Sequence, residues 1–141
     1  MRRSLSLLCL LLAAGACNTT DSTTSTTSVT APTPAVITET FSGTVDVGGN
    51  AVNPFTIALS GGQVNVILTA AGPPSTIYMG LGVGAYDGTA CTLLTGGSVV
   101  TPAGAAAQLA GYLNAGAYCV MVYDAGNQTA SITYSVTVNH Y

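Results

Sequence analysis

Charged side chains are scarce in this chain of 141 residues, and cations are almost absent. The only two cations are Arg2 and Arg3, whereas five residues are Asp or Glu. If the N-terminus is removed, five acids and no bases leave a formal charge of −5. A surface without cations repels phosphate, so the composition excludes nucleic acid as a partner and excludes attraction to anionic lipid headgroups.

Residues that catalyse reactions or bind metals are equally scarce. The chain has one His, His140, next to last in the sequence, and no Gly-x-Ser-x-Gly pattern surrounds a serine. Zinc needs several N or S ligands and calcium needs six to eight oxygens, and no such cluster occurs. Asp46, Asp87 and Asp124 lie near separate turns, and turn chemistry explains each. We therefore expect no enzyme, no metal site and no cofactor.

The first 16 residues resemble a bacterial lipoprotein signal peptide. Two arginines precede an apolar stretch of about ten residues, which is too short for a membrane span of about twenty. Ala14-Gly-Ala16 then precedes Cys17. In such proteins a diacylglycerol is attached to the cysteine, which becomes the new N-terminus. The family usually has Leu where this chain has Ala14, and ordinary secretion with cleavage after Ala16 is the alternative.

Four cysteines fit this reading. Cys9 lies in the segment that is removed, and lipidation would use Cys17. Cys91 and Cys119 remain, an even pair in an oxidising compartment, so we expect a disulfide between them. Asn18 is not the aspartate associated with inner-membrane retention, which favours the outer membrane.

Residues 17–35 are rich in Thr and Ser and contain no aromatic residue. Such a segment buries too little apolar surface to offset its ordering entropy, so we expect a disordered tether. Its composition would also suit O-glycosylation, although a plain spacer explains it equally.

Residues 36–141 form short apolar runs separated by Gly, Asn and Pro turns. This pattern predicts a single antiparallel β-sandwich, jelly-roll-like, with about seven to nine strands. A two-glycine link suggests that the strands at 55–59 and 64–68 form a hairpin. The stretch 117–123 is apolar on both faces, which predicts a central core strand. Gly104–Leu113 is ambiguous: its alanines favour helix, but its neighbours are all strand-like, so we favour a strand or an irregular connection.

One predicted strand has glycine at alternate positions. Gly80, Gly82 and Gly84 would share a face with Tyr78 at one end and Tyr86 at the other. That face could be a bare groove in which the two tyrosines stack on sugar rings, which makes it a candidate ligand surface. Alternatively, a neighbouring aromatic residue or loop lies across the glycines.

The domain resembles the bacterial pre-peptidase C-terminal family over residues 39–141. The resemblance rests on Phe55-Thr-Ile-Ala-Leu followed by Gly61-Gly-Gln-Val-Asn-Val-Ile-Leu, on Leu113-Asn-Ala-Gly-Ala-Tyr and on Tyr134-Ser-Val-Thr-Val. It implies a non-catalytic β-sandwich of a kind that binds substrate polymers or assists export. The family often has an acidic start to its middle strand. Here Ser75-Thr-Ile-Tyr-Met has no carboxylate, so a calcium site of the family type is not expected.

The leading hypothesis is a lipid-anchored envelope protein that binds polysaccharide or another envelope component without catalysis. The first alternative is a structural or assembly protein that contacts itself or a partner protein. The second is a hydrolase with a pocket around His140. The envelope-binding hypothesis would be favoured by an exposed groove at Tyr78 and Tyr86. The assembly hypothesis would be favoured by an uncovered apolar edge or patch, and the hydrolase hypothesis by a carboxylate within reach of His140.

Overall fold

The structure, a computed structural model, describes residues 35–58 and 60–141 as eight β-strands with no helix. The strands are β1 (Ile37–Val45), β2 (Asn50–Ile57), β3 (Gly62–Gly72), β4 (Tyr78–Tyr86), β5 (Cys91–Pro102), β6 (Leu109–Leu113), β7 (Gly116–Asp124) and β8 (Ile132–His140). The expected all-β domain with seven to nine strands is confirmed. Within the described range, no helix has the length and hydropathy that crossing a membrane requires. The signal segment 1–16, Cys17 and the tether as far as residue 34 lie outside the described residues.

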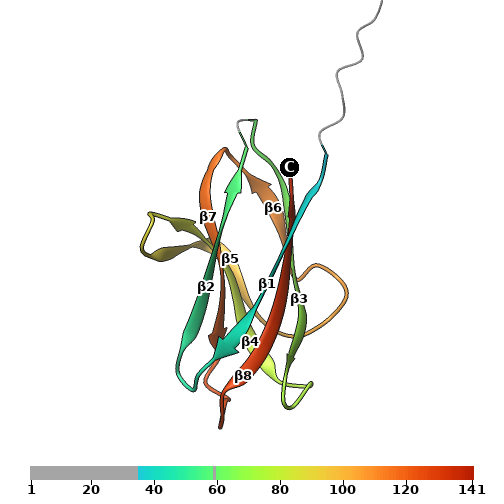
Figure 1. Cartoon of the computed structure of the whole chain (residues 1–141), viewed down its shortest axis with the longest axis vertical. Helices are drawn as coiled ribbons and strands as arrows, with labels where there is room; N and C mark the ends of the chain where they lie inside the picture. Colours follow the sequence, from blue (N-terminus) through green and yellow to red (C-terminus); the bar gives the residue numbers. More distant parts are fainter. Residues whose placement is uncertain (1–34, 59) are drawn as a thin grey trace, which may run out of the picture. The chain divides into compact units, whose positions relative to one another are not determined.

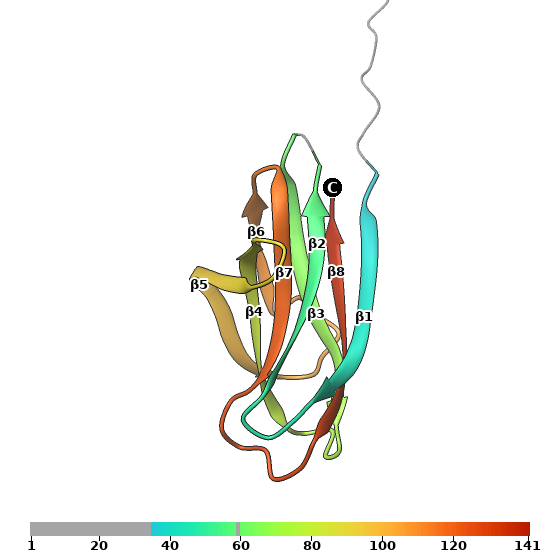
Figure 2. The same cartoon turned by 60° about the vertical axis from the view of Figure 1, so that its left-hand side comes forward.

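The strands form two antiparallel four-stranded sheets that pack face to face (Figures 1 and 2). Sheet A has the strand order β1-β8-β3-β6, and sheet B has the order β2-β7-β4-β5. The first strand therefore pairs with the last, the second with the seventh, the third with the sixth and the fourth with the fifth. A chain doubled back on itself and rolled into two sheets is a jelly roll, so the jelly-roll prediction is confirmed.

The core lies between the sheets and follows from the period-two alternation of apolar residues. In β8 the buried residues are Ile132, Tyr134, Val136, Val138 and His140, and the residues between them are exposed or half-buried. Burying one large apolar side chain contributes about 1.5–3 kcal/mol. The core therefore supplies most of the stability through residues such as Ile57, Val66, Leu68, Met79, Leu81, Val120, Val122 and Val136.

The predicted hairpin between β2 and β3 is wrong, because these strands belong to different sheets. A turn connects them, in which the Gly61 N–H donates to the Ala58 carbonyl over 3.0 Å. β2 pairs with β7 over eight residues, whereas β3 pairs with β8 and β6. The apolar faces of β2 and β3 therefore meet across the core. A short glycine link is compatible with a hairpin in one sheet and with a connection between two sheets. The pairing of β2 and β3 with strands distant in the sequence decides which one forms.

The ambiguous segment 104–113 is an irregular connection followed by strand β6, so the preference for strand or irregular structure is confirmed. Gln108 continues the pairing where no strand is present. Its Oε1 accepts a hydrogen bond from the Leu68 N–H at 2.8 Å, and its own N–H donates to the Val66 carbonyl at 3.0 Å.

Residues 91–102 form the single strand β5, which contains a large bulge. Gly84 pairs with Leu93 and Gly82 pairs with Ser98, so residues 94–97 loop out opposite one residue of β4. Gly96 has a φ of 73°, a conformation that favours glycine.

Candidate functional site

The glycines of β4 are covered by side chains from the two flanking strands. Gly80, Gly82 and Gly84 are all buried. A Cβ added to Gly80 would overlap the ring of Tyr123 on β7, and one added to Gly82 would lie 2.6 Å from Cδ2 of Leu93 on β5. The open groove predicted along this strand is therefore wrong, and the alternative of an aromatic residue lying across the glycines is confirmed.

The two tyrosines at the ends of β4 do not frame one surface. Tyr78 and Tyr86 are eight residues apart, which is about 26 Å along a strand. Tyr78 is 52% exposed, whereas Tyr86 is half-buried and its hydroxyl donates to the Gly88 carbonyl at 3.0 Å. Because the strand between them is covered, the structure does not provide the sugar-stacking groove.

The predicted disulfide between Cys91 and Cys119 is present, and it covers the third glycine. The two Cα atoms are 5.9 Å apart. Cys91 begins β5 and Cys119 lies in β7, the two strands that flank β4, so the bond crosses β4. A Cβ on Gly84 would lie 2.9 Å from the Cys91 sulfur and 2.6 Å from the Thr92 carbonyl oxygen.

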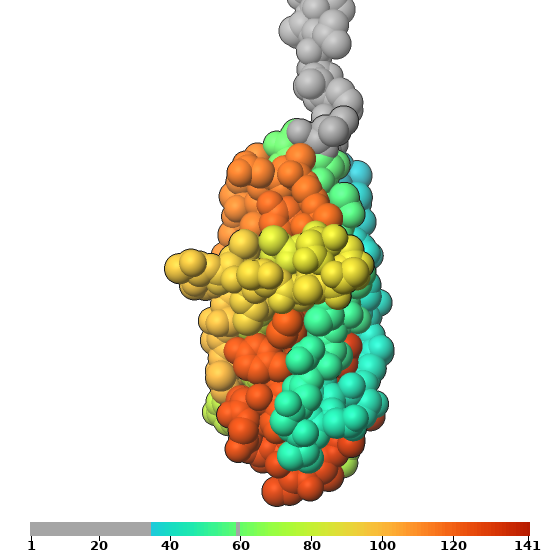
Figure 3. Space-filling model, turned by 90° about the vertical axis from the view of Figure 1, so that its left-hand side faces the viewer, coloured from blue at the N-terminus to red at the C-terminus, as the bar shows by residue number. Residues whose placement is uncertain are grey.

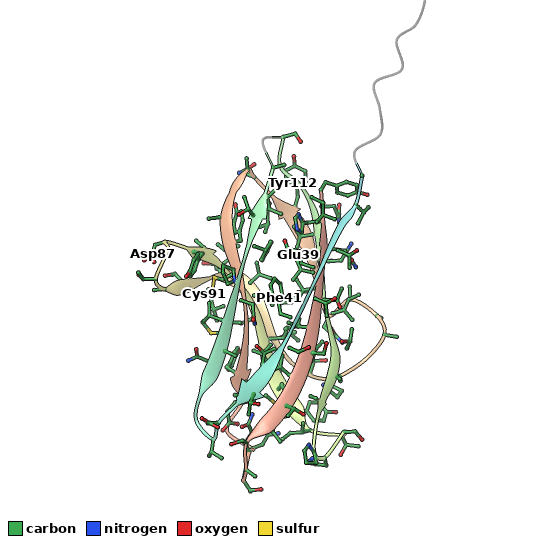
Figure 4. All side chains as sticks on the ribbon, viewed as in Figure 1. Glu39, Phe41, Asp87, Cys91 and Tyr112 are labelled. Atoms are coloured by element: carbon green, nitrogen blue, oxygen red, sulfur yellow. A yellow bond between two sulfur atoms is a disulfide. The ribbon has the colours of Figure 1, made fainter. Side chains whose placement is uncertain are left out.

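The disulfide fastens the hairpin between β4 and β5 across the outside of sheet B. Figure 3 shows this segment, in yellow, crossing the orange and green strands β7 and β2. Asp87 organises the turn, because its Oδ1 accepts hydrogen bonds from the backbone N–H groups of Ala90 at 2.7 Å and Thr89 at 2.8 Å. These bonds, with that from Ala90 the most important, hold the pKa of Asp87 below its usual value. Asp87 lies at the outer end of the hairpin, and Cys91 lies where the hairpin returns (Figure 4).

The larger side chains on the outward side of sheet B are mostly apolar, and all four strands contribute at least one of them. Two rows of paired residues cross it: Val52, Met121, Gly82 and Ser98, then Asn50, Tyr123, Gly80 and Val100. Val100 is 53% exposed, and Val52 and Leu93 are each 36% exposed. Asp124, the last residue of β7, is the one charged residue in these strands. We define the apolar face by its larger side chains, Val52, Tyr78, Leu93, Val100, Met121 and Tyr123.

The outward side of sheet A is polar over β1 and β8. Thr38 pairs with Asn139, Thr40 with Thr137 and Ser42 with Ser135, and we define the hydroxyl face by these six residues. The Thr38 hydroxyl donates to Asn139 Oδ1 at 2.8 Å, and the Thr40 and Thr137 hydroxyls are 3.3 Å apart. Such cross-strand pairs stabilise a sheet while leaving its outer face hydrated.

Asp124 ties two loops together beside the apolar face. Its Oδ2 accepts a hydrogen bond from the Gly48 N–H at 2.8 Å, and its Oδ1 accepts one from the Gly126 N–H at 2.7 Å. The bond from Gly48 is the main reason that the pKa of Asp124 lies below its usual value. The carboxylate therefore has a structural task, as the turn positions predicted.

A carboxylate does lie within reach of His140. The His140 Nε2 is 2.8 Å from Glu39 Oε1, and the imidazole is only 2% exposed, beside the ring of Phe55. The other nitrogen, Nδ1, is buried without a hydrogen-bond partner among the described residues. A hydrolytic triad needs a hydroxyl or thiol on that nitrogen. The pair therefore joins the beginning of β1 to the end of β8, and the geometry offers no nucleophile.

Within the described range, no three His, Cys, Asp or Glu residues come together as metal ligands. Asp46 accepts a hydrogen bond from the Ser131 hydroxyl at 2.7 Å, so it too is engaged in loop contacts.

The apolar face was not predicted from the sequence, although the apolar residues on both sides of β7 indicated it. β7 is central, as predicted, because it pairs with β2 on one side and β4 on the other. Its apolar residues on both faces were interpreted as full burial. In fact Val120 and Val122 face the core, while Met121 and Tyr123 lie half-buried on the outer face. An antiparallel sandwich ordinarily exposes one polar face per sheet, so a strand apolar on both faces indicates an outer contact.

Few known proteins are similar to this chain. No family model matches the chain, and no curated protein matches its sequence. One similar solved structure is the crystal structure of Aeromonas hydrophila PliG, a periplasmic lysozyme inhibitor of g-type lysozyme. It is 18% identical, the match covers 74% of this chain and 86% of that chain, and the TM-score is 0.48. A likeness of this extent supports no statement about activity or partner. The pre-peptidase C-terminal resemblance stays a prediction.

Proposed function

We propose that this protein is a lipid-anchored, non-catalytic envelope protein that binds a basic partner protein through its apolar face. The observation that carries the proposal is the chemistry of that face. Its larger outward side chains are Val, Leu, Met and Tyr, whereas the outward positions of β1 and β8 on the other sheet are occupied by Thr, Ser and Asn. Contiguous apolar surface on an otherwise polar domain is typical of a protein interaction site.

The covered glycines favour a protein partner over a polysaccharide. A sugar-binding surface needs exposed aromatic rings together with hydrogen-bonding groups. On the apolar face, Tyr123 lies over Gly80, and Tyr78 is the one tyrosine that is half exposed. The remaining large side chains offer contact area and few polar atoms, which is the character of an interface core.

The charge of the domain indicates the charge of the partner. Residues 35–141 contain Glu39, Asp46, Asp87 and Asp124 and no Lys or Arg. Asp87 lies in the turn between β4 and β5, and Asp124 is the last residue of β7. A partner with cationic residues around an apolar centre would complement this arrangement, and its association would be faster at low salt. A second copy of the chain would bring acids against acids.

The location rests on the N-terminal sequence. The signal-like residues 1–16, Cys17 and the Thr/Ser-rich tether support export, lipid attachment and display away from a membrane, with the outer membrane favoured. A disulfide in the domain fits an oxidising compartment.

The proposal can be tested by photo-crosslinking the full chain in its native cells. A photoreactive amino acid is placed at Val100, on edge strand β5 of the apolar face. The matched control places it at Thr40, which is exposed on edge strand β1 of the hydroxyl face. Covalent adducts are then identified by mass spectrometry.

We expect one protein adduct from position 100, absent from position 40, whose partner is basic. A polysaccharide adduct would restore the carbohydrate hypothesis, and an adduct with a second copy would favour the assembly alternative. Equal adducts from both positions, or none from position 100, would refute a specific apolar docking face.

A further inference from the structure

An apolar pocket of about 160 Å³ opens between the sheets on the side where β5 and β6 lie together. Its walls come from both sheets. Val64 and Val66 of β3 and Leu109 and Leu113 of β6 form one side, and Val83 of β4 with Leu94 in the β5 bulge forms the other. A cavity of about 150 Å³ holds one benzene ring. The pocket therefore has room for a single Leu, Ile or Phe side chain.

The pocket exists because an inward position of β6 is a glycine. Gly111 pairs with Val64, whose side chain is buried in the core, so residue 111 faces inward. A Cβ added to Gly111 would meet no atom within 4 Å. The contrast with Gly80, Gly82 and Gly84 is direct, because those glycines are covered and this one is open.

β6 is also an edge strand without the usual protection. The four edge strands of the sandwich are β1, β6, β2 and β5. Natural edges are protected by inward charges, prolines or bulges. β1 has the inward Glu39, β2 has Pro54, and β5 has its bulge and Pro102. The β6 sequence, Leu109-Ala-Gly-Tyr-Leu113, has none of these features.

We propose that β6 is a docking strand for an extended peptide segment of a partner protein. The segment adds to the free edge of β6 and places one apolar side chain in the pocket above Gly111. Main-chain hydrogen bonds would supply affinity and the pocket would supply specificity, as in other cases of strand addition. A free small ligand fits less well, because Thr95 is the one polar side chain in the lining and could not anchor a polar group strongly.

This site is separate from the apolar face. The pocket opens beside β6 of sheet A, whereas the apolar face is the outer side of sheet B. Either proposal can therefore fail while the other stands.

The test titrates the full chain, with its disulfide formed, with the synthetic peptide acetyl-Lys-Thr-Val-Thr-Leu-Thr-Val-Lys-amide. Binding is followed by backbone amide NMR shifts and by hydrogen exchange of residues 109–113. In two companion peptides the central Leu is replaced by Phe or by Gly. Two further peptides are N-methylated on alternate residues, one at the odd-numbered positions and the other at the even-numbered positions. In an added strand only one set of N–H groups faces β6.

We expect saturable binding by the Leu or Phe peptide, with slower exchange in β6. Losing the central side chain should weaken binding roughly tenfold to a hundredfold, because one large side chain leaves an apolar pocket. One N-methylated peptide should bind and the other should not.

Gly111→Val fills the pocket with a side chain of the protein itself. It should lower the affinity for the Leu peptide by at least about tenfold while the fold is kept. Thr40→Val places the same side chain on β1, at the opposite edge of sheet A from β6 and outside the pocket lining, and should leave binding within about twofold. No saturable binding up to about 1 mM would overturn the proposal. So would equal binding of both N-methylated peptides, or unchanged binding to Gly111→Val.

Discussion

The two outer faces of this sandwich share one strand geometry and differ in chemistry. The hydroxyl face pairs Thr, Ser and Asn across β1 and β8, and two of its pairs are in hydrogen-bond contact. The apolar face presents Val, Leu, Met and Tyr across β2, β7, β4 and β5, with a column of covered glycines beneath them. An antiparallel sheet that packs on one side needs only the first kind of surface to be stable in water.

The difference indicates which face has a task beyond folding. Charged residues make up 5% of the chain, so hydroxyl and amide groups must supply most of its hydration. Within such a composition, an apolar outer face lowers solubility unless something covers it. The hairpin fastened by the disulfide covers part of the face, and we propose that the partner covers the rest.

Removing the disulfide should have the largest effect on stability. Cys91→Ala with Cys119→Ala should lower the free energy of unfolding by about 3.5 kcal/mol, because the bond closes a loop of 28 residues. Amide exchange should accelerate first in the hairpin over the apolar face and later in β1 and β8. Urea unfolding and hydrogen exchange measure the two effects. Uniform acceleration on both faces would show that the bond does not hold the hairpin locally.

Filling the glycine column should have the next largest effect. Gly84→Ala should destabilise the fold by about 3 kcal/mol, because its Cβ meets the Thr92 backbone, which cannot move aside. Gly80→Ala should cost less, because its neighbour is the side chain of Tyr123. Urea midpoints of both variants measure the difference. A tolerated Gly84→Ala would mean that the apolar face is more loosely packed than described.

Acid should weaken the apolar side through Asp124. Its folded pKa is lowered, chiefly by the Gly48 N–H, so its contribution to stability is present above the ordinary value of about 3.9. The contribution is lost as the pH falls from there through the lower folded pKa. Stability should therefore fall less steeply with acid in Asp124→Asn than in the natural chain. Urea midpoints between about pH 6 and pH 2 test this, and parallel curves would contradict it.

Isosteric exchange between the faces should have the smallest effect. Thr40→Val and Val100→Thr should each change the free energy of unfolding by less than about 0.5 kcal/mol, because both positions are exposed on edge strands. Thermal unfolding measures this. A larger loss in Val100→Thr would mean that the apolar face is retained for stability rather than for binding.

The sequence predicted those features of the fold that depend on residue patterns rather than on the pairing of distant strands. The apolar runs between Gly, Asn and Pro turns predicted an all-β sandwich, and the cysteine count predicted the Cys91–Cys119 bond. The sheets to which β2 and β3 belong could not be predicted, because strand partners about sixty to seventy-five residues away decide them.

The candidate site was harder to predict than the fold. Alternate glycines in β4 are compatible with an open groove or with covering side chains. The covering residues, Tyr123 and Leu93, come from strands whose register is not readable in one sequence. Gly111, in contrast, is uncovered, because no atom lies within 4 Å of the position that its Cβ would take.

One measurement tests the functional account most directly. The partner recovered by crosslinking from position 100 is titrated with the full chain and with two double variants. Val100→Asn with Met121→Asn alters the apolar face, and Thr40→Asn with Thr137→Asn alters the hydroxyl face by the same uncharged residue. We predict that the first variant weakens binding by about tenfold or more and that the second stays within about twofold. Equal affinities for the two variants, or a larger loss on the hydroxyl face, would contradict the proposal that the apolar face binds the partner.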